Sequence, residues 1–191
     1  MKLNAQFDKT EKVIGPGEYY ATAEDIVIST LLGSCIAVAL YEPFRKVGGL
    51  NHFMLPGIPE KATVYSAEAR YGIQAMELLI NDLFKLGAVK KMLHAKVFGG
   101  SSMLEYEKAT SFNVAKKNIE FVFEFLETEK IPVESYSVGG AVPRKVFFFP
   151  ASGRVLMKYT TIRTPGLANR ERRYSETLLE NARNAGKPII F

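Results

Sequence analysis

The sequence predicts a mixed α/β (α+β) domain, and three observations lead to this fold class. Hydrophobic residues make up 47% of the 191-residue chain, which is enough for a full core. Strand-like runs rich in aromatic and β-branched residues surround two segments of helical periodicity. Their order is strands, helix, strand, helix, strands, which is typical of helices packed against sheets. We therefore expect one domain over residues 1–160 and a basic extension over residues 161–191.

The predicted strands are short runs bounded by turn residues. They are expected at 17–22, 25–30, 35–41, 47–55, 92–98, 133–138, 144–149 and 154–160. The segment EPFRK connects the third and fourth runs, and Pro43 suits a turn there. PASG at 150–153 joins the last two runs as a short hairpin loop. Residues 1–10 show neither pattern and are expected to be loose.

Two helices are predicted within the domain and one in the extension. Apolar residues recur at helical spacing from Ser66 to Leu86 and from Asn113 to Lys130, and Ser66 can cap the first helix. A narrower apolar stripe predicts a terminal helix over 169–185. A helix of that length is marginal alone in water, so we expect it to dock. Its own domain and an acidic helical partner are the two candidate surfaces.

Charge and composition exclude several classes of protein. The net charge of +5 permits an acidic partner, but the basic residues are scattered, with RERR at 170–173 the densest cluster. Since no zinc-finger, RNP or helix-turn-helix pattern occurs, we expect no nucleic-acid partner. We also expect a cytoplasmic protein without membrane insertion, because no signal peptide and no apolar run of ~20 residues occurs. The single cysteine excludes an internal disulfide and fits a reducing compartment.

The single cysteine, Cys35, and one of the two histidines, His52, lie in neighbouring strand-like runs. A turn centred between Pro43 and Phe44 would place them directly opposite each other on one face of a hairpin. Directly opposed Cβ atoms lie ~4.5–5.5 Å apart, which is within side-chain contact. A bulge at 48–49 would slip the register by one residue and put the two side chains on opposite faces.

This pair suggests a nucleophile and its base. A free thiol has a pKa of about 8.5, and a histidine in contact with it can take its proton. The N–H groups of Gly33 and Ser34 can then stabilise an oxyanion, and we expect Cys35 to be solvent-reachable and unusually acidic. Either nearby hydroxyl, from Ser29 or Thr30, can orient the imidazole. The alternative is a buried core cysteine beside an incidental histidine.

Two further groups have competing interpretations. His94 lies in an apolar strand and is interpreted as a core histidine. A zinc site made by His94 with Cys35 and His52 is the alternative, but it lacks the usual close-spaced ligand pair, so we expect no metal. The segment Gly99, Gly100 and Ser101 after the fifth run either lines a substrate site or forms a plain turn.

The two runs around Cys35 and His52 read LGSCIAVALY followed by GGLNHFMLP. Further segments follow along the chain: ARYGIQAMELLI, AKVFGGSSM, FNVAKKNIEFV and SVGGAVPRKVFFFPASGRVLMK. In sequence and in order, these segments resemble the CheD family, the chemoreceptor glutamine deamidases of bacterial chemotaxis. The resemblance covers roughly residues 13–160, so the extension lies outside it.

The resemblance implies a cysteine hydrolase whose β-sheets pack between helices, a fold also found in bacterial toxins that deamidate small GTPases. It implies that Cys35 is the nucleophile and His52 the base. The third catalytic residue of the family is usually a Thr at the position of Ser29, with Thr30 next to it here. The chain also has Ser137 where the family favours Asp, and Ser where it favours Ala at position 102.

The implied activity is hydrolysis of glutamine side-chain amides on chemoreceptor cytoplasmic domains, without a cofactor. The same chemistry can hydrolyse glutamate methyl esters, and the family implies a CheC-type phosphatase as a further partner. The main alternative is an interaction protein that binds that phosphatase or the receptors without turnover. A weaker one is a thiol hydrolase with an unrelated substrate.

Overall fold

The computed structural model of the chain describes residues 1–55, 69–102, 110–160 and 166–184. Its helices are α1 (Ala69–Lys85), α2 (Thr110–Thr128) and α3 (Leu167–Asn184), with a short 3-10 turn η1 (Lys90–Met92). Its strands are β1 (Lys2–Asn4), β2 (Lys9–Val13), β3 (Tyr19–Thr22), β4 (Val27–Leu32), β5 (Ile36–Glu42), β6 (Val47–Asn51), β7 (His94–Gly99), β8 (Val133–Val138), β9 (Arg144–Phe149) and β10 (Arg154–Tyr159).

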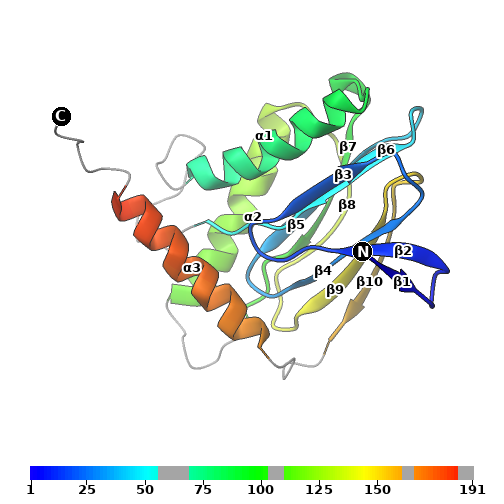
Figure 1. The fold of residues 1–191 in the computed structure, drawn as a ribbon. Coiled ribbons are helices and arrows are strands. Elements are labelled where there is room, and N and C mark those ends of the chain that lie inside the picture. The colour runs from blue at the N-terminus through cyan, green and yellow to red at the C-terminus, as the bar shows by residue number, and fades with distance from the viewer. Residues whose placement is uncertain (56–68, 103–109, 161–165, 185–191) are drawn as a thin grey trace, which may run out of the picture.

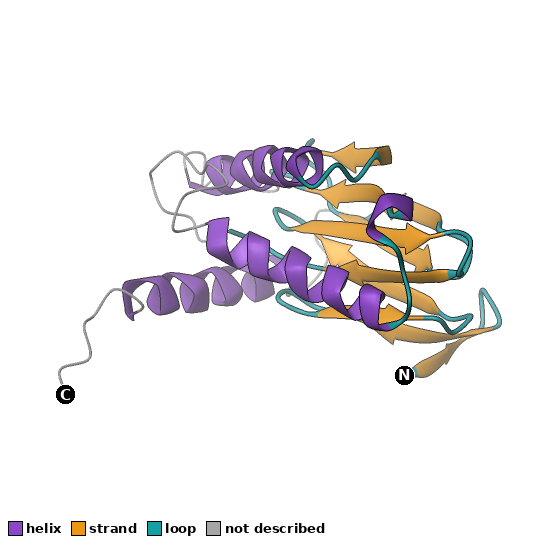
Figure 2. Cartoon of the chain, turned by 90° about the horizontal axis from the view of Figure 1, so that it is seen from above, coloured by secondary structure: helices purple, strands orange, loops and turns teal. Residues whose placement is uncertain are grey.

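The strands form two five-stranded mixed sheets, which confirms the mixed α/β class. One sheet has the order β1-β2-β4-β9-β10 and the other β3-β6-β5-β7-β8. Helices α1 and α2 cover the outer face of the second sheet, and α3 crosses one end of the molecule (Figure 1). Seen from above, the three helices gather toward one end of the strands (Figure 2). The helices therefore lie on one side of the paired sheets and at their end.

Strand β5 is buried over its whole length because both of its faces are covered. Ile36, Val38 and Leu40 point toward α1 and α2 and belong to the core beneath these helices. The alternate residues, Cys35 just before the strand and Ala37 within it, belong to a second core between the two sheets. The alternation of a strand thus places the thiol between the sheets.

The hairpin of β5 and β6 differs from the predicted register by two residues. Glu42 pairs with Val47 and Ala39 with Leu50, so the turn is centred between Phe44 and Arg45. The Glu42 carboxylate accepts a hydrogen bond of 2.9 Å from the Phe44 N–H, which stabilises this longer turn.

The predicted direct opposition of Cys35 and His52 is therefore wrong. An isolated bridge joins Ile36 to Phe53, which continues the same register beyond the strands. A shift of two residues keeps both side chains on one face, so the two residues are diagonal neighbours, still within reach of each other. The pairing at Gly48 and Gly49 is continuous, without a bulge.

Most other elements lie close to their predicted positions, and the 150–153 loop joins β9 to β10 as expected. The expectation of loose residues at 1–10 is wrong, because β1 and the start of β2 lie there. Strand β2 pairs in parallel with β4, a long-range pairing that no local pattern reveals. Ser66, the predicted cap, lies outside the described residues. Among the described helices, none has the length and apolar character of a membrane span.

Candidate active site

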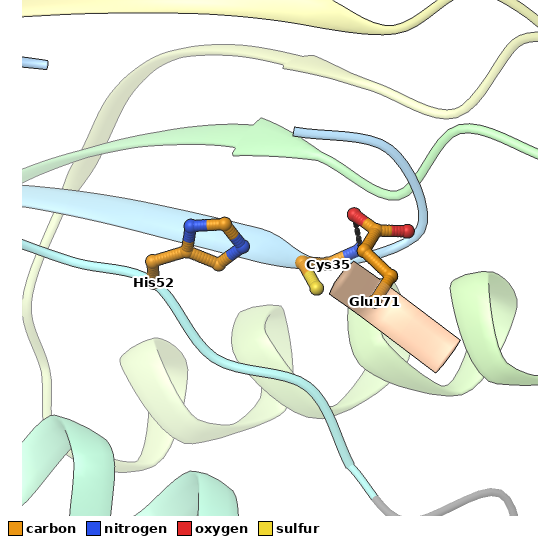
Figure 3. Close-up of side chains that lie close together, drawn as sticks. All are labelled: Cys35, His52 and Glu171. Atoms are coloured by element: carbon orange, nitrogen blue, oxygen red, sulfur yellow. Dashed lines mark hydrogen bonds between the residues drawn. The ribbon is translucent and has the colours of Figure 1, made fainter. Parts of the chain in front are cut away.

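Three buried side chains meet where the β4–β5 loop, the end of β6 and α3 come together. They are Cys35, His52 and Glu171, and their sulfur, ring nitrogen and carboxylate oxygen atoms all lie within 4.8 Å of one another. Figure 3 shows the thiol between the imidazole and the carboxylate. The structure thus brings Cys35 and His52 together as predicted, and adds an acidic residue from the extension.

Thr30 fixes the orientation of the His52 ring. Its hydroxyl oxygen lies 2.8 Å from the carbonyl oxygen of Ile14 and 2.7 Å from Nδ1 of His52. A hydroxyl has one hydrogen, which goes to the carbonyl because the carbonyl can only accept. The Nδ1–H of His52 therefore donates to Thr30, and Nε2 carries the lone pair. Nε2 has no protein hydrogen-bond partner in the described part of the chain, as a base awaiting a proton requires.

Ser29 is not part of this arrangement. Its hydroxyl donates to the carboxylate of Glu11. Neighbouring residues of a strand point to opposite faces, so Ser29 lies on the outer face of its sheet while Thr30 faces His52. Of the two hydroxyls considered from the sequence, the structure brings only Thr30 to the imidazole.

The loop before β5 offers a set of N–H groups that converge on the Glu171 carboxylate. One carboxylate oxygen accepts the N–H of Gly33 at 2.8 Å and that of Cys35 at 3.5 Å. The other accepts the N–H of Ser34 at 2.9 Å and its hydroxyl at 2.7 Å. Such a concave set of N–H groups binds anions and can stabilise an oxyanion. We refer to the N–H groups of Gly33, Ser34 and Cys35 as the anion nest.

The carbonyl groups of the same loop are all held on its other side, which keeps the N–H groups turned toward the site. The Gly33 carbonyl accepts the N–H of Ser101 at 2.7 Å, and the Cys35 carbonyl accepts the N–H of Gly100 at 2.8 Å. The Ser34 carbonyl accepts a hydrogen bond of 2.9 Å from Nδ2 of Asn118. Asn118 is fully buried and also accepts the N–H of Leu55 at 2.7 Å.

The segment Gly99–Ser101 therefore supports the loop before β5 through its backbone. Gly99 has a φ of +117°, and a Cβ atom there would lie 2.1 Å from the carbonyl oxygen of Cys35. Only glycine permits such an approach. The Ser101 hydroxyl is buried without a hydrogen-bond partner among the described residues. A direct contact of these three residues with substrate stays a prediction.

Both reactive groups are uncharged in this closed arrangement. Burial raises the pKa of the Cys35 thiol well above its usual range, and the neighbouring Glu171 carboxylate raises it further. Burial, with a smaller effect of the Arg170 charge, lowers the pKa of His52 to about 3. The expected solvent-reachable, acidic thiol is thus contradicted here, since Cys35 is 0% exposed beneath α3.

The histidine of the alternative zinc site lies elsewhere. His94 stacks against Tyr41, and its Nδ1 lies 3.0 Å from the Glu134 carboxylate. The zinc site that includes His94 is therefore wrong.

Cys35, His52 and Glu171 are each of a type that binds zinc. However, both Glu171 oxygens already accept hydrogen bonds from the nest. We therefore interpret the cluster as a thiol–imidazole site rather than as a zinc site.

Sequence reasoning missed Glu171 and Asn118, although each carries a signal. Glu171 is the acidic residue of RERR, and it lies in helical register with Leu167, Tyr174 and Leu178 on the buried face of α3. Asn118 is a polar residue on the apolar face of α2, four residues before buried Val122. A polar residue within an apolar stripe indicates a specific hydrogen-bonding role.

Comparisons with known proteins find a matching family model and relatives that cover nearly the whole chain. A family model described as CheD chemotactic sensory transduction matches residues 54–159. The "Probable chemoreceptor glutamine deamidase CheD 1" of Shewanella oneidensis is 46% identical over 187 residues, covering 97% of this chain and 89% of that protein. The "Probable chemoreceptor glutamine deamidase CheD" of Methylobacillus flagellatus is 43% identical and covers all of this chain and 96% of its own length.

Proposed function

This chain belongs to the CheD family, and on that premise we propose that it is a protein-glutamine deamidase that acts on chemoreceptors. The observation that carries the proposal is the meeting of three elements at one point. These are the thiol of Cys35, the unprotonated Nε2 of His52 and the anion nest. A nucleophile, its base and oxyanion donors are the parts that acyl transfer requires.

In the first half of the reaction, Nε2 of His52 takes the thiol proton as Cys35 attacks the carboxamide carbon of a bound glutamine. The sulfur–carbon bond forms and the carbonyl oxygen gains negative charge, which the nest N–H groups stabilise. The imidazolium then gives its proton to the amide nitrogen. The carbon–nitrogen bond breaks, and ammonia leaves behind a γ-glutamyl thioester.

In the second half, water replaces ammonia. Nε2 of His52 takes a proton from the water as its oxygen attacks the thioester carbon. The carbon–sulfur bond then breaks, and the imidazolium returns its proton to the Cys35 thiolate. The balance is glutamine plus water to glutamate plus ammonia. The same steps hydrolyse a glutamate methyl ester with methanol as the leaving group.

Thr30 is a positioning residue in this reaction. It accepts the Nδ1–H of His52, and this hydrogen bond strengthens when the ring becomes charged during proton transfer. Gly99–Ser101 and Asn118 hold the nest in its orientation from behind. A cytoplasmic location and binding of a CheC-type phosphatase are part of the proposal.

The second candidate function is a binding module without turnover. The observation that favours it is the complete burial of Cys35, which leaves the thiol covered by α3. Both candidates bind receptors, so they differ only in chemistry.

The experiment incubates the purified chain with the cytoplasmic fragment of a chemoreceptor and maps the peptides by mass spectrometry. The proposal predicts conversion of specific glutamines to glutamate by the wild-type chain and none by Cys35→Ala. His94→Gln is the control for a substitution outside the site, because His94 contacts Glu134, and it should convert the same glutamines as the wild type. Receptor binding with no conversion by any of these proteins would favour the module instead.

A further inference from the structure

Glu171 occupies the position in which the proposed reaction would leave its product, the carboxylate of a substrate glutamate. Its carboxylate accepts hydrogen bonds from Gly33 and both donors of Ser34, and it lies beside the sulfur of Cys35. Hydrolysis of a substrate glutamine also leaves a glutamate carboxylate beside this sulfur and within the nest. The side chain of the extension is thus chemically identical to the product of the proposed reaction.

The rest of α3 is seated by apolar contacts along the same face of the helix. Leu167 and Leu178 are 3% and 4% exposed, and Glu171 itself is 5% exposed. Tyr174 packs against Gly17, where a Cβ atom would lie 2.8 Å from its ring. These four residues follow helical spacing, so one face of α3 covers the thiol. The remaining face is polar and largely exposed.

While α3 is seated, no other carboxamide can reach Cys35. The thiol is 0% exposed, and the nest donors are occupied by Glu171. A substrate must therefore displace Glu171 and bind to a surface that already accepts an α-helix. What α3 presents to this surface is a glutamate with buried leucines four positions before it and seven positions after it.

We propose that α3 is an intramolecular product analogue, and that the surface it covers binds the substrate as a helix with its glutamine in the place of Glu171. This inference rests on the proposed function. On this proposal the extension inhibits the enzyme by covering Cys35, and the contacts that hold Glu171 are the same contacts that select the substrate glutamine. Receptor helices that carry a glutamine at the equivalent position compete with α3 for this surface.

The proposal has a direct chemical consequence. In a Glu171→Gln variant, the carboxamide oxygen takes the place of the carboxylate oxygen that accepts Gly33 and Cys35 N–H. The amide nitrogen takes the place of the other oxygen, where it can donate to the Ser34 hydroxyl, while the Ser34 N–H loses its acceptor. Cys35 then attacks the introduced carboxamide of its own chain, ammonia leaves, and water hydrolyses the thioester to glutamate. The variant restores the wild-type residue by its own chemistry.

The experiment uses the full chain with two substitutions on α3, Glu171→Gln and Glu176→Gln. Glu176 is exposed on the same helix, so the glutamine introduced there is the internal control for non-specific deamidation. Peptide mapping by mass spectrometry is expected to find glutamate at position 171 and glutamine at position 176. The same protein with Cys35→Ala is expected to keep glutamine at both positions.

The outcomes separate the two proposals. If the glutamine at position 171 persists while the same preparation converts a receptor glutamine, the site is catalytic but α3 is not a product analogue, and this inference is overturned. If it persists and no receptor glutamine is converted, the proposed function fails and the inference falls with it. Conversion at position 171 in the protein without Cys35, or equal conversion at position 176, would also overturn the inference.

Discussion

Replacing Thr30 by valine removes the hydroxyl that orients His52 while keeping nearly the same side-chain volume. Thr30 is fully buried, and its oxygen lies 2.7 Å from Nδ1 of His52. Without this acceptor, the Nδ1–H has no partner, and the ring loses its support at the moment when proton transfer makes it positive. An orphaned buried donor costs about 1–3 kcal/mol. If that cost falls on the transition state, kcat decreases by about 5- to 150-fold.

The assay measures ammonia release from a receptor fragment at several substrate concentrations. Thr30 lies behind the imidazole rather than in the nest, so kcat is expected to fall while KM stays constant. The matched control is Ser29→Ala, which removes a hydroxyl that binds Glu11 on the other face of the strand. Its kcat is expected to equal that of the wild type. Full activity in Thr30→Val, or a larger loss in Ser29→Ala, would refute the assignment of the third residue.

Three other changes test separate parts of the site. Glu171→Ala removes a negative charge beside Cys35 and part of the side-chain cover over it, so the pKa of the Cys35 thiol should fall. The alkylation rate of Cys35 at neutral pH should rise, and an unchanged rate would argue against shielding by α3. Asn118→Leu orphans the Ser34 carbonyl and the Leu55 N–H, and urea unfolding should show a loss of about 1–3 kcal/mol for each group. His52 is buried and neutral, with its pKa lowered from 6.5 to about 3, while the unfolded chain binds a proton near pH 6.5. The free energy of unfolding should therefore decrease as the pH falls from 6.5 toward 3, and His52→Gln should flatten that decrease.

The hairpin shows how much of the site follows from local sequence. Two apolar runs with a turn between them predict that Cys35 and His52 come together, and this holds because strand alternation keeps them on one face. The register itself depended on the turn, where the Glu42 side chain bonds to the Phe44 N–H and moves the centre by one residue. Such side-chain control of a turn has no simple signature.

The rest of the site depends on contacts between distant parts of the chain. Glu171 meets Gly33 across 138 positions, and Asn118 meets Ser34 across 84. A polar residue on an amphipathic helix indicates that it has a partner without saying which one. The choice between Ser29 and Thr30 also depended on the tertiary structure, because only the packing of β4 determines which of its faces lies against His52. Local patterns therefore predicted the pair of Cys35 and His52, whereas the roles of Thr30, Asn118 and α3 around this pair could be found only from the tertiary structure.

The central claim is that Cys35 forms a covalent thioester with a receptor glutamine. Hydroxylamine tests it most directly, because this nucleophile competes with water for the thioester and leaves a γ-glutamyl hydroxamate. We predict that the wild-type chain, incubated with a receptor fragment and hydroxylamine, places hydroxamate at the same positions that become glutamate in water. Cys35→Ala should yield neither product. Glutamate formation without any hydroxamate, or hydroxamate formation by Cys35→Ala, would contradict the covalent mechanism.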